Sequence, residues 1–236
     1  MIPQLRAGAL SDIGRLRLDN QDRCLFDEDL GLFGVADGVG GLPGGAAAAE
    51  TAATAVTDTL RALQAEREPD LAAVVAEANR RVCEIGRQLS PVLGIASTLT
   101  FACRRGHRLA IAHVGDSRCY RWHAGKLHCL TEDHSVENEA RKRGEACPPD
   151  HRQALVQCVG QLPAPVPDVT VRSLVRGERY LFCTDGVSGL MSDGEIGSIL
   201  GRDGTPAELL QQLVSLALRR GGPDNASGVL VFVDEA

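Results

Sequence analysis

Three aspartates stand at the edges of apolar segments, where carboxylates can meet. Asp37 and Asp185 each follow a short apolar run, and Asp224 precedes the last such run. Carboxylates at strand ends converge readily on a cleft at a sheet edge, where they repel one another unless a cation lies between them. A ligand set of oxygens alone suits Mg²⁺ or Mn²⁺. Gly38 lets the backbone come close, so its carbonyl is a further candidate ligand. We therefore expect a divalent metal site around these residues.

The alternative interpretation of each Asp-Gly pair is a hairpin turn. A hairpin requires an alternating strand on both sides. Asp37-Gly38 is instead followed by a glycine-rich stretch and an alanine-rich segment. Asp185-Gly186 is followed by a short apolar stretch and then by polar residues. Neither continuation alternates like a partner strand, so we favour the metal site over two turns.

Two other segments carry candidate site residues. Residues 11–22 include Arg17, whose guanidinium fits a phosphate group bidentately, among side-chain oxygens suited to a metal shell. The alternative for this segment is a charged surface strand. Residues 113–118 place Asp116 between two expected strands.

The elements that must position these residues follow from the pattern of apolar positions. We expect an early strand and turn at 11–20, a strand at 30–36, and helices at 46–65 and from Pro69-Asp70 onward. Later strands are expected at 97–103, 108–114, 117–122, 126–130, 169–175, 179–184 and 228–233, with a helix at 206–220. Short turns join most of the strands. This favours an α+β fold with a central antiparallel β-sandwich flanked by α-helices, in a single domain over residues 1–236.

Composition limits the class of protein. A chain of 236 residues with 44% hydrophobic residues can bury a substantial core. The net charge of −6, without any Lys/Arg block, argues against binding to nucleic acid or an anionic membrane. No apolar run approaches the roughly 18 residues of a transmembrane helix, and the N-terminus has no signal-peptide core. None of the eight cysteines is paired at C-x-x-C spacing, so reduced thiols are expected. We expect a soluble cytoplasmic monomer.

Taken together, these segments resemble the protein phosphatase 2C family, the metal-dependent Ser/Thr phosphatases, in its compact bacterial form. They occur in the family's order and span nearly the whole chain, which is a stronger indication than any one of them alone. The matching segments are 14–17 with Asn20-Gln21-Asp22, then 35–41, 115–118, 131–135, 184–186 and 224–227.

The resemblance implies the family's β-sandwich fold and a set of metal ligands. Asp37 would bridge two metal ions, either Mn²⁺ or Mg²⁺. Gly38 would offer its carbonyl to one of them, and Asp185 with Asp224 would hold the other. Asp116, together with Asp185, would form the third metal site described in bacterial members.

The resemblance also implies the reaction. Asp22 would orient metal-bound water and Arg17 would bind the phosphate. A metal-bridging hydroxide would attack phosphoserine or phosphothreonine directly, so Asp37 and Asp22 are the catalytic candidates. The substrates would be phosphorylated proteins, themselves products of a Ser/Thr kinase, which places the chain in signalling.

Two positions depart from the family pattern. Gln21 stands where the family usually has Glu, and its amide accepts hydrogen bonds but carries no charge, so we expect weaker binding of the second metal. Val39 stands where many eukaryotic members carry a histidine proposed as general acid. The Gln21 difference motivates one alternative, a pseudophosphatase that binds phosphoproteins without turnover. The retained acidic residues argue against it.

Two unrelated functions fit less well. A phosphate-cradling loop at 38–45 would need the Gly-Lys-Ser/Thr ending of a P-loop, and Pro43 stands where a dinucleotide fingerprint needs Gly or Ala. A serine hydrolase built on Ser117 would need a helix after the serine, whereas an apparent strand follows.

Overall fold

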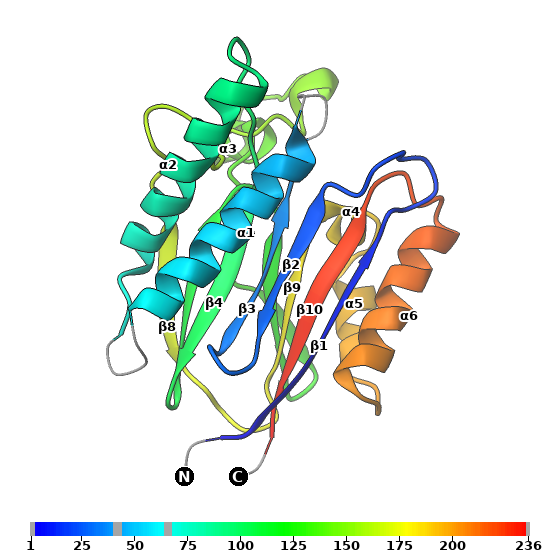
Figure 1. The fold of residues 1–236 in the computed structure, drawn as a ribbon. Coiled ribbons are helices and arrows are strands. Elements are labelled where there is room, and N and C mark those ends of the chain that lie inside the picture. Colours follow the sequence, from blue (N-terminus) through cyan, green and yellow to red (C-terminus); the bar gives the residue numbers. More distant parts are fainter. Residues whose placement is uncertain (1–2, 40–43, 64–67, 235–236) are drawn as a thin grey trace.

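Two antiparallel sheets pack face to face, with helices on their outer faces (Figure 1). The computed structural model describes residues 3–39, 44–63 and 68–234. One sheet has the order β1 (Leu5–Asp12), β10 (Ala226–Val233), β9 (Arg179–Cys183), β6 (Arg118–His123), β7 (Lys126–Cys129). The other has the order β2 (Asp22–Asp27), β3 (Leu32–Asp37), β4 (Leu99–Arg105), β5 (Arg108–Val114), β8 (Asp168–Ser173). The predicted antiparallel β-sandwich is confirmed.

Strand β10 shows how the sequence produces these layers. It is apolar at nearly every position and is buried along its whole length. Because successive side chains of a strand point to opposite faces, Val229, Val231 and Val233 pack in the cluster between the two sheets. Leu230 and Phe232 pack in the cluster under the outer helices. A strand buried on both faces therefore joins the inter-sheet core to the helical layer.

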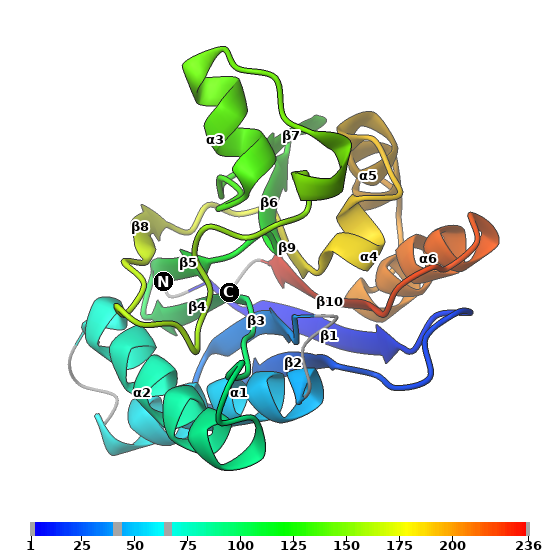
Figure 2. The ribbon, with the colours of Figure 1, turned by 90° about the horizontal axis from the view of Figure 1, so that it is seen from above.

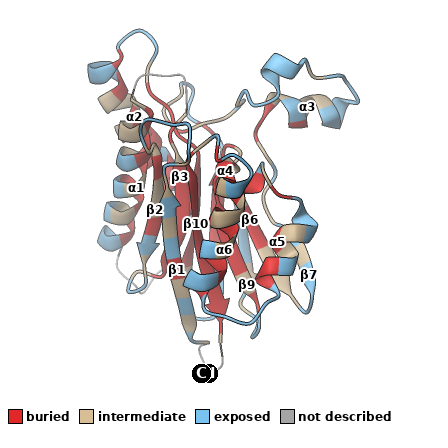
Figure 3. Cartoon of the chain, turned by 90° about the vertical axis from the view of Figure 1, so that its right-hand side faces the viewer, coloured by how far each residue is buried: buried red, intermediate tan, exposed pale blue. Residues whose placement is uncertain are grey.

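The helices form the outer layers (Figure 2). α1 (Gly45–Ala62) and α2 (Leu71–Leu89) cover the sheet of β2 to β5. α4 (Asp185–Ser188), α5 (Asp193–Leu200) and α6 (Pro206–Arg219) cover the other sheet. α3 (Val136–Arg143) and the 3₁₀ turn Pro149–His151 lie apart from both layers and are largely exposed (Figure 3). Among the described helices, none is both long and apolar enough to cross a membrane.

The start of α2 agrees with the sequence. The Asp70 carboxylate accepts hydrogen bonds from the backbone N–H groups of Ala72 and Ala73, at 3.0 and 3.2 Å. Asp70 thus satisfies two of the donors that a helix leaves unpaired at its N-terminus. The apolar positions Leu71, Val74, Val75, Ala78 and Val82 are buried against the sheet and α1.

Some of the expected elements differ in the structure. The early strand predicted at 11–20 is wrong in extent: β1 ends at Asp12, and the next residues form an irregular loop, because hydrogen bonds from other segments hold them. Strand β2 and helices α4 and α5 were not predicted. Parts of two predictions, the glycine-rich stretch at 40–43 and the helix end at 64–65, lie outside the described residues.

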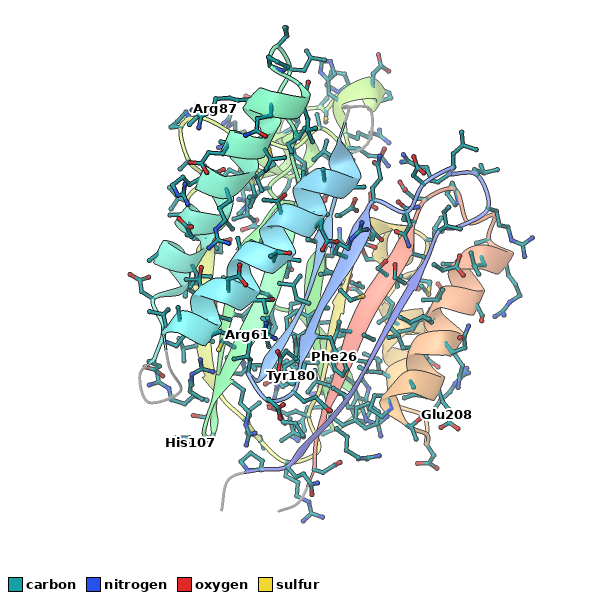
Figure 4. The ribbon with its side chains drawn as sticks, in the orientation of Figure 1. Phe26, Arg61, Arg87, His107, Tyr180 and Glu208 are labelled. Carbon is teal, nitrogen blue, oxygen red and sulfur yellow. The ribbon has the colours of Figure 1, made fainter. Side chains whose placement is uncertain are left out.

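One end of the sandwich gathers the segments that carry the candidate site. β3 ends there at Asp37, and α1 begins there. In Figure 4, Arg87 near the end of α2 marks this end of the molecule, and His107, in the turn between β4 and β5, marks the opposite end. The first and last described residues lie close together, because β1 and β10 pair along their whole length.

The close approach of β3 and β4 gives a stability prediction. Gly34 pairs with Phe101, and a Cβ at Gly34 would lie 2.5 Å from both the Phe101 Cβ and the Thr100 carbonyl oxygen. Gly34→Ala must push the strands apart, so we expect the free energy of unfolding to fall by about 1–3 kcal/mol in urea denaturation. Gly194→Ala in α5 is the control, because a Cβ there has nothing within 4 Å. Equal stability of the two variants would contradict the packing argument.

Candidate metal centre

Asp22 and Asp37 are directly opposite each other where β2 begins and β3 ends. Asp22 is buried, and its Oδ2 accepts a hydrogen bond of 2.9 Å from the Thr184 hydroxyl. Its Oδ1 is buried without a hydrogen-bond partner in the described part of the chain. Burial, and after it the charge of Asp185, raises the pKa of Asp22 to about 6. This carboxylate is therefore held in place with one oxygen free.

The backbone of Asp37 is fixed by the neighbouring strand β4 and the residues before it. The Asp37 carbonyl accepts hydrogen bonds from the Thr98 N–H at 2.8 Å and from the Ser97 hydroxyl at 2.9 Å. The Asp37 N–H donates to the Thr98 hydroxyl at 3.0 Å. Burial raises the pKa of Asp37 well above its usual value, and the charges of Asp22 and Asp185 add to this.

Asp185 and Asp224 are brought together by a close backbone contact. Asp185 is the first residue of α4, separated from the end of β9 only by Thr184, and Asp224 lies just before β10. A Cβ on Gly186 would lie 1.9 Å from the Asn225 carbonyl oxygen, so only glycine allows this approach. Burial, and after it the charge of Asp224, raises the pKa of Asp185, whose buried Oδ1 has no hydrogen-bond partner among the described residues.

Asp116 lies in the turn between β5 and β6 and completes the acidic group. Burial, and after it the charge of Asp185, raises the pKa of Asp116 to about 7. The predicted residues Asp37, Gly38, Asp116, Asp185, Asp224 and Arg17 all line one cleft of about 230 Å³, together with Val39, Thr98, Gln153 and Leu155. Asp22 does not line this cleft but pairs with Asp37 across β2 and β3.

Arg17 reaches into this cleft from the loop between β1 and β2. Its Nη2 donates to Asp224 Oδ2 at 2.6 Å, and both side chains are partly exposed. The predicted anion-binding residue and a predicted metal ligand are therefore in direct contact. Because a guanidinium has five N–H donors, this contact leaves others available to a further acceptor.

The acidic group fits a divalent cation. Two of its buried carboxylate oxygens, on Asp22 and Asp185, have no partner in the protein, and a buried polar atom left unpaired is costly. In the chain from 3 to 234, apart from 40–43 and 64–67, no three His, Cys, Asp or Glu side chains are grouped as a complete ligand set for one ion. Mg²⁺ is usually held by one or two carboxylates, with water making up its shell. The unpaired oxygens of Asp22 and Asp185, beside a cleft that Gly38 also lines, fit a cation with such a shell.

A larger cleft of about 640 Å³ lies between α3 and strands β6 and β7. It contains Arg118 and Asp133, but these form a bidentate ion pair with distances of 2.7 and 2.9 Å. Arg152 in the same cleft faces Glu137 at 3.5 Å. Since its charges largely offset one another, the smaller acidic cleft is the better candidate for chemistry.

Asn225 is a supporting residue that sequence reasoning did not identify, as are Ser97 and Thr98. Its buried amide accepts a hydrogen bond from the Gln21 N–H at 2.9 Å and donates to the carbonyls of Ile13 and Asp19 at 2.9 and 3.0 Å. Asn225 thereby ties the loop bearing Arg17 to the segment bearing Asp224. The signals for Asn225 were its place directly after Asp224 and its inclusion in the family-like segment 224–227.

Gln21 does not line the cleft. Its side-chain oxygen lies against Gly45, the first residue of α1, only 2.7 Å from where a Cβ on that glycine would be. Of the two positions that depart from the family pattern, Gln21 is therefore next to the acidic residue Asp22 and in contact with the helix start, whereas Val39 lines the cleft.

The role of Asn225 can be tested by substitution. Asn225→Ala leaves three backbone groups of the loop without their partner, so we expect the free energy of unfolding to fall by about 2–4 kcal/mol. Amide hydrogen exchange in residues 13–21 should accelerate. Asn79→Ala is the matched control, because its buried amide holds another loop through Gly160 and Gln161. Unchanged exchange in residues 13–21 of Asn225→Ala would contradict this role.

Known proteins resemble this chain over nearly its whole length. The family description Protein phosphatase 2C matches residues 17–204. A protein phosphatase 2C-type protein of Streptococcus pyogenes is 33% identical over 236 residues, covering 94% of each chain. The serine/threonine protein phosphatase PstP of Mycobacterium tuberculosis is 31% identical over 243 residues, which cover 97% of this chain but 45% of that protein.

Solved structures agree with this relationship. The serine/threonine phosphatase of S. agalactiae superposes with a TM-score of 0.88 at 30% identity, covering 98% of this chain and all of that one. The catalytic domain of PstP in complex with two manganese ions superposes with a TM-score of 0.81 at 32% identity, covering 98% of this chain and 99% of that one. The chain belongs to the protein phosphatase 2C family.

Proposed function

We propose that this chain is a metal-dependent protein phosphatase that hydrolyses phosphoserine and phosphothreonine in proteins. One observation carries the proposal: buried carboxylate oxygens without partners, on Asp22 and Asp185, adjoin a cleft that Arg17 also lines. Such a site combines a place for divalent cations with a cationic group for a phosphate. The related proteins described above are phosphatases of the same family.

The cations would be Mn²⁺ or Mg²⁺, and PstP is known with two manganese ions. We propose that Asp37 and Gly38 hold one ion and that Asp37, Asp185 and Asp224 hold the other. Asp116 with Asp185 would provide a third site. When bound, the ions lower the pKa of water and offset charge on the phosphate oxygens.

The chain's own residues supply positioning and charge. Arg17 would bind two phosphate oxygens, because a guanidinium matches them with parallel N–H donors. Asp22 would accept a hydrogen bond from the attacking water through its free Oδ1, since its Oδ2 is already held by Thr184. Ser97 and Thr98 keep Asp37 at the cleft through its backbone.

The finer assignments are also proposals. The substrates would be proteins phosphorylated by a Ser/Thr kinase, and residues 1–236 would act as one phosphatase domain and as a monomer. All eight cysteines are free thiols, which supports a reducing compartment such as the cytoplasm. Gln21 gives little support to a binding-only protein, because it does not line the cleft and the acidic residues that do are retained.

Metal dependence is the first test. With Mn²⁺ the purified protein should hydrolyse p-nitrophenyl phosphate, and EDTA should abolish the activity. Asp37→Asn should lower kcat by more than about a hundredfold, since it removes a charged ligand shared by both ions. Asp203→Asn, at an exposed aspartate outside the cleft, serves as the control. Near-wild-type kcat in Asp37→Asn would sink the assignment.

The phosphate role of Arg17 makes a different kinetic prediction. Arg17→Ala should raise KM for a phosphopeptide by roughly 10- to 100-fold with a smaller change in kcat, because hydrogen bonds to charged groups contribute about 1.5–3 kcal/mol. Arg15→Ala is the matched control, since Arg15 is exposed on the same loop and does not line the cleft. An unchanged KM in Arg17→Ala would remove this residue from phosphate binding.

A further inference from the structure

The loop between β1 and β2 presents large apolar side chains to solvent on both sides of Arg17. The exposed fractions are 72% for Leu16 and 94% for Leu18. Single exposed apolar residues are common on protein surfaces and need no explanation. Here two of them flank a residue that lines the cleft, and such a local concentration often marks a site of binding.

The exposure of these leucines does not come from a loosely attached segment. The Arg15 N–H donates to the Gly222 carbonyl at 2.7 Å. Asn225 donates from its side chain to the carbonyls of Ile13 and Asp19, on either side of the two leucines. The loop is therefore fixed at both ends to the segment before β10, and it holds Leu16 and Leu18 in place beside the cleft.

The position of Arg17 indicates what would cover these side chains. Arg17 points into the cleft, where it contacts Asp224. A phosphorylated residue bound there must carry its chain neighbours across the edge of the cleft, since consecutive Cα atoms are only 3.8 Å apart. Leu16 and Leu18 are the chain neighbours of Arg17 and so lie within the same short distance of it.

We propose that Leu16 and Leu18 form an apolar rim that selects phosphoprotein segments with an apolar side chain next to the phosphorylated serine or threonine. This inference rests on the proposed phosphatase function. Arg15 and Asp19, which border the rim, are exposed and have opposite charges. The charges beside the rim therefore do not favour substrate segments of either positive or negative net charge. Burial of apolar surface is then the main source of discrimination that the rim offers.

The rim is preferred over another exposed apolar region because it adjoins the cleft. Val92, in the turn after α2, is 91% exposed and lies near a separate cavity of about 180 Å³ formed by α2 and the residues around 160. The loop of the rim and the turn after α2 lie well apart in both views of the ribbon (Figures 1 and 2). Val92 therefore provides a matched control.

The test compares three substrates in the wild type and in a Leu16→Ser/Leu18→Ser variant. Two are phosphothreonine peptides of equal length and charge, with leucine or with serine on both sides of the phosphothreonine, and the third is p-nitrophenyl phosphate. The variant should lose about tenfold in kcat/KM on the leucine peptide and little on the serine peptide. Turnover of p-nitrophenyl phosphate should not change, because it has no neighbouring residues to reach the rim. Val92→Ser should behave as wild type on all three.

An equal loss of kcat/KM on the two peptides, no loss on the leucine peptide, or a comparable loss in Val92→Ser would overturn the proposal. So would a wild-type dimer that dissociates in the Leu16→Ser/Leu18→Ser variant on size-exclusion chromatography, because the leucines would then be covered by a second copy. Failure of the phosphatase assignment looks different, since the wild type would then hydrolyse none of the three substrates. In that case fluorescence anisotropy with labelled peptides still decides whether the leucine peptide binds about tenfold more tightly through the rim.

Discussion

The repulsion among the four carboxylates of one partly buried cleft and Asp22, which pairs with Asp37, is the constraint on which the rest of this structure depends. Burial raises the pKa values of Asp22, Asp37, Asp116 and Asp185, and the charges of neighbouring carboxylates add to the effect. Such groups stay together only where the surrounding fold holds them. A divalent cation would relieve both the repulsion between the carboxylates and the cost of burying unpaired oxygens, because it offsets the charge and gives those oxygens a partner. The acidic cleft is therefore better explained as a site for chemistry than as a feature that stabilises the fold.

The two-sheet architecture is what holds these groups against their repulsion. Asp37 ends a strand of one sheet, and its carbonyl and N–H are bound by Ser97 and Thr98. Asp22 is bound by Thr184, which follows a strand of the other sheet. Asn225 then links the start of β10 to the loop that carries Arg17. Because the contributing segments come from both sheets, neither sheet alone could form the site.

Local sequence patterns predicted the central residues because strand ends are marked by a change from apolar to polar residues. Asp37, Asp185 and Asp224 stand at such changes, and the antiparallel sandwich followed from short turns between strands. Helix α5 was missed although Ser192 and Glu195 form a reciprocal capping box. The irregular loop after β1 could not be predicted, since Asn225, which holds it, lies more than 200 residues away in sequence. Contacts of this range leave no periodic signal.

The balance between carboxylate repulsion and cation binding can be measured directly by thermal unfolding of the wild-type protein with increasing Mn²⁺. A ligand that binds only the folded state raises the melting temperature with its concentration. We expect a large, saturable increase that is lost on addition of EDTA and greatly reduced when Asp185 and Asp224 are both replaced by asparagine. A melting temperature independent of Mn²⁺, or an equal increase in the doubly substituted protein, would contradict the account of a fold organised around a divalent metal site.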